Sequence, residues 1–264
     1  MSMSKEQKNY LGKIKKNKIL IILIQILIVT IFLFTWQFLS DKKIINPFIF
    51  SSPKKIVETI VSLYHNYNLF SHIFTTIFET LIAFVLGISL GFVIAILLYE
   101  FKTLAKIVDP FLTMLNSLPK VALGPIIIIW TGANTKSIIT MALLINLIIS
   151  IITIYNGFLN TDPYKIKLLK SFKASKIQIL KEVVIPASYT TILSSLKINI
   201  SMSLIGVITG EFLVSKKGIG YLIIYGTQVF NLNIVMSGII ILIFISFILY
   251  ELMNFLEKRL VKEK

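Results

Sequence analysis

The chain of 264 residues contains no cysteine, a single arginine and only two histidines. The absence of cysteine excludes disulfides, thiolate catalysis and cysteine-ligated metal sites. His65 and His72 lack the spacing of metal ligands, and we expect both to be polar surface residues with no metal bound. The net charge of +15 comes almost entirely from lysine, which lacks the forked guanidinium suited to bidentate phosphate recognition, so we predict no nucleic-acid binding.

Long apolar runs dominate what is present. The chain is 56% hydrophobic with a mean hydropathy of +0.85, and its apolar residues form runs of about 20 residues, the length that crosses a lipid bilayer. Lysines gather in the gaps between these runs, as they do in cytoplasmic loops. The pattern predicts an all-α, multi-pass protein of the cell membrane with about six spans and both termini in the cytoplasm.

The apolar runs divide the chain into three parts. Residues 1–18 form a basic cytoplasmic N-terminus, residues 19–256 a single transmembrane domain, and residues 257–264 a cytoplasmic tail. The first run is a retained anchor, because no small-residue cleavage site follows it. The predicted spans are residues 19–39, 74–98, a third beginning near 110, 137–158, 189–214 and 234–255.

The connections between spans carry their own signals. Lys54–Tyr64 predicts an amphipathic helix near the outer interface, and Glu100–Asp109 a short charged turn. Residues 130–134 predict a tight outer turn, and Ser215–Gln228, which contains glycine, a non-helical outer segment.

Two spans contain small or helix-breaking residues. Gly87 and Gly91 form a G-x-x-x-G pattern that permits close helix approach. The third span carries Pro119, Gly124 and Pro125, and we expect it to be kinked or broken there.

One polar segment, Asn160–Ser188, interrupts the apolar runs and carries helix signals of its own. Asp162 and Pro163 predict an N-cap and first helical turn, and Ser175 with Gln178 forms a capping box. Pro186 predicts a break before the next span. We expect two short helices joined by a bend near residues 172–174, on the cytoplasmic side.

The chain shows no nucleophile with a base, no metal-ligand cluster and no phosphate loop, so it is not expected to be an enzyme. Any uphill transport would be energised by an ion gradient or by a separate subunit. Residues that could line a transport path are the ionisable or helix-breaking ones inside the spans. The alternative is that the lysines snorkel or pair and that the glutamates meet water or helix ends. These candidates are Glu79, Pro119, Lys120, Lys197 and Glu211.

The polar segment resembles the cytoplasmic EAA loop of the permease subunits of ABC importers, whose pattern is roughly D-P-x-x-x-E-A-A-x-x-x-G-A-S followed about ten residues later by a proline. The matching positions are Asp162, Pro163, Ala174, Ser175 and Pro186. The departures are Lys167 for the glutamate, Leu168 and Leu169 for the alanines, and Lys173 for the glycine.

Further stretches resemble the same permeases in the same order. LPKVALGPIIIIWTG, residues 118–132, is similar to their I-P-x-x-A-x-x-P-L-x-x-x-W-F-G stretch, and KGIGYL, residues 217–222, to the S-G-L-G-Y-L turn after the fifth span. The resemblance covers about residues 49–255. It is strongest to permeases of the nitrate, sulfonate and taurine type, whose relatives also carry pyrimidine precursors of thiamine.

The resemblance implies a type I importer permease that works as a homodimer in the lipid bilayer, with two ATP-binding subunits below and a substrate-binding protein outside. ATP and Mg²⁺ would bind the partner ATPase and no cofactor this chain. The helix from Pro163 would be the coupling helix, with Ile166, Leu169 and Phe172 as an apolar stripe that contacts the ATPase or packs on the permease itself. Lys167 predicts an acidic or neutral ATPase groove.

From another class, an ion-coupled secondary carrier or a non-transporting assembly protein remains an alternative. A carrier would be expected to have paired acidic residues at mid-membrane, and the sequence shows no such pattern.

Overall fold

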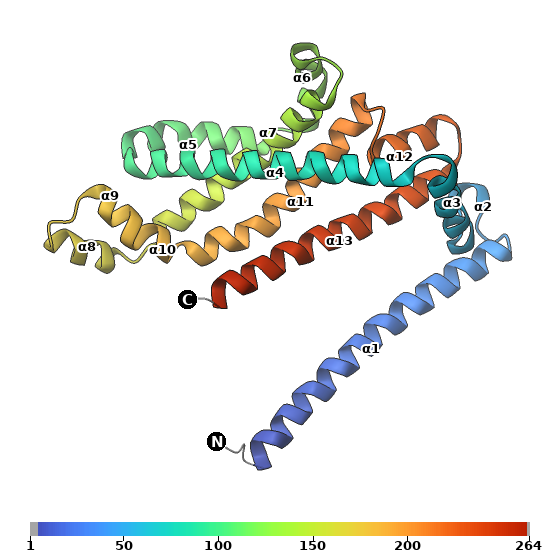
Figure 1. Cartoon of the computed structure of the whole chain (residues 1–264), viewed down its shortest axis with the longest axis horizontal. Coiled ribbons are helices and arrows are strands. Elements are labelled where there is room, and N and C mark those ends of the chain that lie inside the picture. The colour runs from blue at the N-terminus through green and yellow to red at the C-terminus, as the bar shows by residue number, and fades with distance from the viewer. Residues whose placement is uncertain (1–4, 263–264) are drawn as a thin grey trace.

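The computed structural model describes residues 5–262, and these form helices without any β-strand. Figure 1 shows long helices running between two ends of the molecule, with short helices gathered at each end. The long helices are α1 (Lys5–Asp41), α4 (Leu69–Glu100), α7 (Thr135–Leu159), α11 (Tyr189–Val214) and α13 (Leu232–Lys262). The shorter elements are α2 (Pro47–Phe50), α3 (Pro53–Asn66), α5 (Lys102–Ser117), η1 (Lys120–Leu123), α6 (Gly124–Thr131), α8 (Pro163–Ser171), α9 (Lys176–Ile179), η2 (Leu180–Val184), α10 (Ile185–Ala187) and α12 (Ile219–Gln228).

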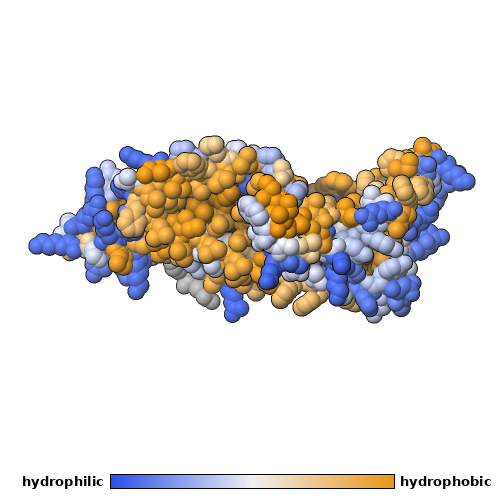
Figure 2. Space-filling model, turned by 90° about the horizontal axis from the view of Figure 1, so that it is seen from above, coloured by the Kyte–Doolittle hydropathy of each residue, from blue (hydrophilic) through white to orange (hydrophobic). Residues whose placement is uncertain are grey.

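Five of these helices are long and apolar enough to cross a membrane, and the bent pair α5 and η1–α6 would make a sixth span. This agrees with the prediction of about six spans. The surface supports it, because Figure 2 shows a hydrophobic band between two hydrophilic ends of the molecule. A bilayer would cover such a band with its hydrocarbon core.

The third span is broken where the prolines predict a break. Helix α5 ends at Ser117, and the axis turns by 91° before α6 continues. Pro119 precedes the short 3-10 turn η1, and Pro125 lies in the first turn of α6. Proline fits both places because the first residues of a helix have no intrahelical acceptor for their N–H groups.

The predicted turn over Glu100–Asp109 is wrong, because these residues are almost entirely helical. Phe101 alone separates α4 from α5. Ala105 and Leu112 are buried in a cluster with Leu98, while Lys102, Lys106 and Asp109 are exposed. The amphipathic pattern therefore continues the helix past the point where charge alone suggested a turn.

Small residues hold α4, α7 and α11 close together. A Cβ added at Gly206 on α11 would lie 2.4 Å from the Cα of Ala142 on α7, and one at Gly210 would lie 2.9 Å from the Cα of Ile138. A Cβ at Gly87 on α4 would lie 2.3 Å from the side-chain nitrogen of Asn146. The close approach predicted from the G-x-x-x-G pattern is confirmed.

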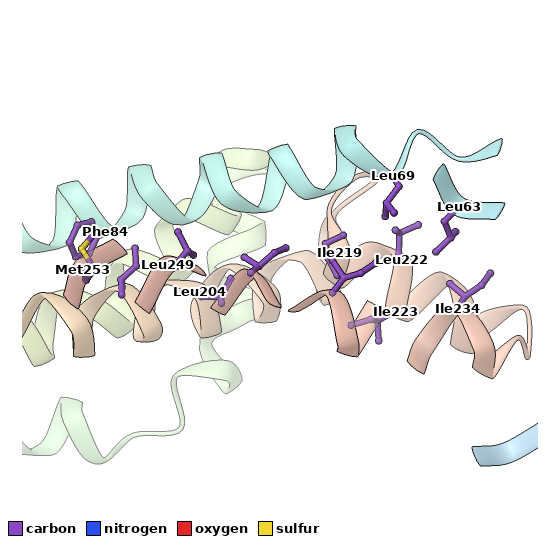
Figure 3. Packing of buried hydrophobic residues seen from close by; sticks show 13 residues of the cluster. Leu63, Leu69, Phe84, Leu204, Ile219, Leu222, Ile223, Ile234, Leu249 and Met253 are labelled. Atoms are coloured by element: carbon purple, nitrogen blue, oxygen red, sulfur yellow. The ribbon is translucent and has the colours of Figure 1, made fainter. Parts of the chain in front are cut away.

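Besides the close packing of α4, α7 and α11, a second core joins α3, α4, α11, α12 and α13. Figure 3 shows its side chains meeting between these helices. The residues labelled there are Leu63, Leu69, Phe84, Leu204, Ile219, Leu222, Ile223, Ile234, Leu249 and Met253.

The prediction of a non-helical segment over Ser215–Gln228 is wrong, since α12 occupies most of it. Gly218, with a φ of 109°, turns the chain sharply at its start. Ile219, Leu222 and Ile223 then place apolar side chains in the second core at helical spacing. The glycines close the turn rather than prevent a helix.

The two ends of the molecule differ in what they contain. Helices α2, α3 and α12 gather at one end, while α8–α10 and the described termini of α1 and α13 lie toward the other (Figure 1). The tail predicted after residue 256 is a continuation of α13, which runs to Lys262. Helix α1 diverges from the bundle (Figure 1), and none of its most apolar stretch is buried.

Candidate functional site

The polar loop begins with the predicted cap. The side chain of Asp162 accepts a hydrogen bond from the backbone N–H of Tyr164 at 2.8 Å, and Pro163 occupies the first turn of α8. Aspartate is preferred at this position because its oxygen satisfies a helix N–H that has no intrahelical acceptor. The start of the predicted first helix is confirmed.

The predicted bend is also present. Lys173 has a φ of 59°, in the left-handed region that favours glycine, where the permease pattern has glycine. Ser175 then caps α9, because its side chain accepts from the Gln178 N–H while the Gln178 side chain accepts from the Ser175 N–H at 2.7 Å. The loop is a defined helix–bend–helix.

The predicted break before the next span is present, because α10 ends at Ala187 and Ser188 separates it from α11. The backbone stays helical from Lys176 to Ala187, and the residues just before Pro186 widen into the π turn η2. Proline cannot donate to the carbonyl four residues earlier, that of Glu182, so a change in the local hydrogen-bond pattern accommodates it. Pro186 therefore lies in the last turn before the break, and the helix ends at Ala187.

The apolar residues of α8 face two ways. Ile166 and Leu169 pack with Ala174 against a buried cluster that includes Phe158 and Val184, so this part of the predicted stripe contacts the permease itself. Phe172 is 74% exposed.

Two further exposed apolar side chains on α8 were not predicted. Tyr164 is 78% exposed and Leu168 is 56% exposed. Leu168 lies one helical turn after Tyr164, and Phe172 follows one turn later on the same side of the helix. The spacing 164, 168 and 172 could have revealed them. We call Tyr164, Leu168 and Phe172 the exposed loop face.

Lys167 lies beside this face. Its amino group is 5.8 Å from the centre of the Tyr164 ring, and its side chain is exposed. The exposed loop face therefore combines apolar groups with positive charge.

Glu211 is buried near the C-terminal end of α11, with 1% of its surface exposed. Its carboxylate accepts hydrogen bonds from the Thr76 hydroxyl at 2.7 Å and from the Gly220 N–H at 2.6 Å. Thr76 in turn accepts from the N–H of Ile219 at 2.9 Å. The side chain thus ties α11 to α4 and to the first turn of α12.

Glu79 lies one turn along α4 from Thr76 and is also 1% exposed. It interacts with the side chain of Thr135 and electrostatically with Glu211, and one of its oxygens has no hydrogen-bond partner among the described residues. The structure thus brings together two acids that the sequence did not pair. They lie near one end of the spans rather than at mid-membrane, since α11 ends three residues beyond Glu211.

His72 differs from the prediction of a surface residue. It is half-buried on α4, its ring nitrogen accepts from the Gly218 N–H at 3.1 Å, and its ring stacks on Tyr221. His65 is exposed, as predicted. No group of three or more potential metal-ligating side chains occurs in the described part of the chain.

The two lysines inside the spans have different surroundings. Lys197 on α11 forms an ion pair with Glu257 on α13 at 2.6 Å, which agrees with the paired alternative. Lys120 is partly buried at the break in the third span, and its amino group donates to the carbonyl of Asn116 at 3.0 Å. Among residues 5–262 it has no carboxylate partner.

A polar network within the bundle was missed at the sequence level. Asn146 on α7 donates to the carbonyl of Ala83 at 3.2 Å and to Ser203 at 2.8 Å, and Ser150 bonds to both Asn146 and Asn199. All these polar side chains are fully buried. The sequence signal that could have revealed this network is the presence of Asn146 and Asn199 in otherwise apolar spans, where an unpaired polar group is costly.

The fold and the loop define an integral membrane transport subunit. Residues 87–262 match the family described as "Binding-protein-dependent transport system inner membrane component", and the chain belongs to this family. It is a permease of an ABC importer and a multi-pass protein of the cell membrane. The family supports the importer over the ion-coupled carrier, and it implies ATP-binding and substrate-binding partners.

Named relatives agree. The chain is 28% identical to a probable ABC transporter permease protein of Haemophilus influenzae, over 89% of this chain and 96% of that protein. It is 27% identical to the putative aliphatic sulfonates transport permease protein SsuC of Bacillus subtilis, over 86% and 82%. It is 26% identical to the formylaminopyrimidine transport permease protein ThiX of Halalkalibacterium halodurans, over 70% and 74%.

Solved structures show the same fold. An inward-facing structure of the MetNI methionine ABC transporter aligns with a TM-score of 0.65 at 17% identity, covering 75% of this chain and 96% of that one. An amino acid ABC transporter with histidines aligns with a TM-score of 0.62 at 16% identity, covering 76% and 97%. The predicted type I importer permease fold is confirmed.

Proposed function

We propose that this permease couples ATP hydrolysis on a partner subunit to uptake of a small solute through the exposed loop face. The observation that carries this proposal is the exposure of Tyr164, Leu168 and Phe172 on a capped helix outside the apolar band. Exposed aromatic and aliphatic side chains of this kind commonly anchor protein interfaces. ATP and Mg²⁺ would bind the partner ATPase.

The partner groove should complement the lysines beside the exposed loop face. Lys167 replaces the glutamate of the permease pattern, and Lys165 is also exposed on α8. An acidic or neutral groove on the ATPase would accept these charges, whereas like charges at an interface are unfavourable. A strongly basic groove on the cognate ATPase would contradict this view.

Two copies of the chain would form the complete permease, with the solute path between them. The broken third span supports this, because it presents a row of exposed apolar side chains around the break. These are Met114, Leu118, Val121, Ile129 and Trp130. A second copy would cover this surface, and rocking of the two copies, driven by the coupling helices, would alternate access to the path.

A small anion of the sulfonate class is the solute that we infer. The resemblance to the named sulfonate permease extends over 86% of the chain, against 70% for the formylaminopyrimidine permease, at nearly equal identity. Lys120 lies at the break without a carboxylate partner, just before the N-terminus of α6. Half-helix N-termini and basic groups within a membrane favour anionic solutes.

The coupling proposal is tested with purified permease, its cognate ATPase and its binding protein in lipid vesicles. Phe172→Ala truncates the last of the three side chains of the exposed loop face. We expect at least a tenfold loss of binding-protein-stimulated ATP hydrolysis. The loss should be accompanied by weaker co-purification of the ATPase. The amount of folded permease should be unchanged, since Phe172 is 74% exposed.

The matched control is Lys170→Ala, on the same helix and also exposed. Residue 170 lies about 160° around the helix from residues 168 and 172, away from the exposed loop face, so its truncation should change hydrolysis less than twofold. Equal hydrolysis by Phe172→Ala and the unchanged chain would refute the role of the exposed loop face. Failure of any ATPase to associate with the chain would refute coupling itself.

The solute class is tested by uptake of radiolabelled taurine and an alkanesulfonate into the same vesicles. Lys120→Met removes the positive charge while keeping a similar length, and we expect sulfonate uptake to fall at least tenfold. Basal ATP hydrolysis should be retained, because α6, which follows the break in the third span, lies well apart from α8 (Figure 1). Uptake of a neutral pyrimidine with no uptake of sulfonates would overturn the solute assignment.

A further inference from the structure

Two buried carboxylates, those of Glu79 and Glu211, lie together in the bundle without a positively charged partner in the described part of the chain. Each side chain is 1% exposed, and the two interact electrostatically. No basic side chain among the described residues comes within ion-pair distance of either one. A carboxylate removed from water without compensation is costly, so the pair needs a source of positive charge.

The start of α12 supplies part of that compensation for Glu211. Its carboxylate accepts from the Gly220 N–H at 2.6 Å and from the Thr76 hydroxyl at 2.7 Å. The N–H groups at the start of a helix carry a partial positive charge, which stabilises an anion placed there. The negative charge of Glu211 is therefore partly balanced within the protein.

Glu79 has no comparable set of donors. It interacts with the side chain of Thr135, and its Oε2 atom is buried without any hydrogen-bond partner among the described residues. Only one other buried side-chain atom in this range lacks a partner, the hydroxyl of Thr161, and that group is uncharged. A buried polar atom in a folded protein almost always has a partner. The Oε2 atom of Glu79 therefore indicates a ligand that the chain itself does not supply.

The side chains that interact with Glu79 are suited to a hard cation. Glu211 from α11 and Thr135 from α7 offer carboxylate and hydroxyl oxygens, the ligands that such cations prefer. A divalent ion is a poorer fit, because Ca²⁺ takes about 6–8 oxygen ligands and Mg²⁺ a near-octahedral shell. No group of three or more potential metal-ligating acids or histidines occurs in the described range. Since α12 partly balances Glu211, one monovalent cation is enough for the pair.

Close packing favours a small ion. A Cβ added at Gly218 would lie 2.3 Å from the carboxyl carbon and both oxygens of Glu211, and one at Gly220 would lie 2.8 Å from a carboxylate oxygen. The backbone therefore lies directly against the carboxylate. Gly218 has a φ of 109°, which glycine adopts without strain. Na⁺ is smaller than K⁺ and fits such a site better.

We propose that Glu79 and Glu211 bind one sodium ion, with the Oε2 atom of Glu79 as its first ligand. The ion would link α4 to α11 beside the turn that starts α12, in addition to the hydrogen bond between Thr76 and Glu211. Thr135 is exposed and marks the side from which an ion would enter. Sodium binding here goes beyond the proposed role in solute uptake and does not depend on the exposed loop face.

The direct test is equilibrium binding of radioactive sodium to the purified permease in detergent. We expect saturable binding of a single ion per chain, competed by unlabelled Na⁺ at least tenfold better than by K⁺. The midpoint of thermal unfolding should be higher in NaCl than in choline chloride at equal ionic strength. The rise should be about 5 °C at roughly 100 times the dissociation constant, because an ion that binds only the folded protein stabilises it.

Glu79→Gln removes the charge and keeps the size of the side chain. We expect at least a tenfold loss of sodium affinity and no effect of NaCl on the unfolding midpoint. The matched control is Glu182→Gln, an exposed acid on η2, which should bind sodium as the unchanged chain does. Should Glu79→Gln fold poorly, Thr135→Val removes a ligand at an exposed position and should weaken sodium binding at least threefold.

Four results would overturn the inference. They are no saturable sodium binding by the unchanged chain, equal binding by Glu79→Gln, equal competition by K⁺, or a midpoint that varies with pH but is the same in NaCl and choline chloride. The last result would mean that a proton, not a metal ion, neutralises the pair.

Binding-protein-stimulated ATP hydrolysis separates this inference from the proposed function. A permease that supports hydrolysis without binding sodium refutes only the sodium site. One that binds sodium but recruits no ATPase refutes only the coupling role.

Discussion

Glu211 shows how one buried side chain can organise the end of the permease that carries α12. Its carboxylate accepts from Gly220 and Thr76, so Glu211→Ala would leave both donors buried without an acceptor. Each such donor costs about 1–3 kcal/mol, and we expect a clear fall in the midpoint of thermal unfolding in detergent. The measurement is the loss of monodisperse protein on heating, followed by size-exclusion chromatography.

Glu182→Ala is the control for this prediction, because Glu182 is an exposed acid on η2. Its removal should change stability by less than about 0.5 kcal/mol. Equal midpoints for the two variants would mean that the turn before α12 does not depend on the Glu211 carboxylate.

Among the site residues, the sequence predicted those whose role is local. The Asp162 cap and the Ser175–Gln178 capping box depend on neighbouring residues, and the structure confirms both. The bonds of Glu211 to Thr76 and Gly220 could not be predicted, because Thr76 lies 135 residues away in the sequence. Spacing on one helix also did not show which side of α8 faces the protein.

At the level of helices, close packing depends on glycines whose neighbours are backbone atoms. A Cβ at Gly206 would lie 2.4 Å from the Cα of Ala142, an atom that cannot move without separating α11 from α7. We therefore expect Gly206→Ala to reduce the yield of folded protein at least fivefold, measured by fluorescence-detected size exclusion. Overpacking of a core typically costs about 1–3 kcal/mol and occasionally more.

Gly157→Ala provides the comparison within α7. A Cβ there would lie 3.1 Å from a methyl group of Thr191, a side-chain atom that can shift slightly. Its yield should stay within twofold of the unchanged chain. A normal yield of Gly206→Ala would show that α7 and α11 can separate at little cost.

The helices that the sequence predicted well are those with uninterrupted apolar runs. The fifth span, predicted at residues 189–214, coincides with α11. Errors arose where charge or glycine was taken to end a helix, at α5 and α12. In both, burial of a few apolar side chains at helical spacing outweighs the local signal, and such burial depends on helices distant in sequence.

For the molecule as a whole, the arrangement of charge predicts its orientation in the membrane. The end that carries α8–α10 also receives the described termini of α1 and α13 (Figure 1). Lysines concentrate in the loop 160–187 and in residues 5–18, and such clusters stay in the cytoplasm. We therefore expect this end to face the cytoplasm and the end with α2, α3 and α12 to face outward.

Single cysteines introduced into the cysteine-free chain test this orientation with a membrane-impermeant maleimide. Lys170→Cys on α8 should react only after the cells are permeabilised, whereas Tyr67→Cys, just after α3, should react in intact cells. Both positions are exposed, so failure to react would reflect sidedness rather than burial. The reverse pattern would invert the topology and place the exposed loop face where ATP and its ATPase are absent, which would contradict the coupling role as well.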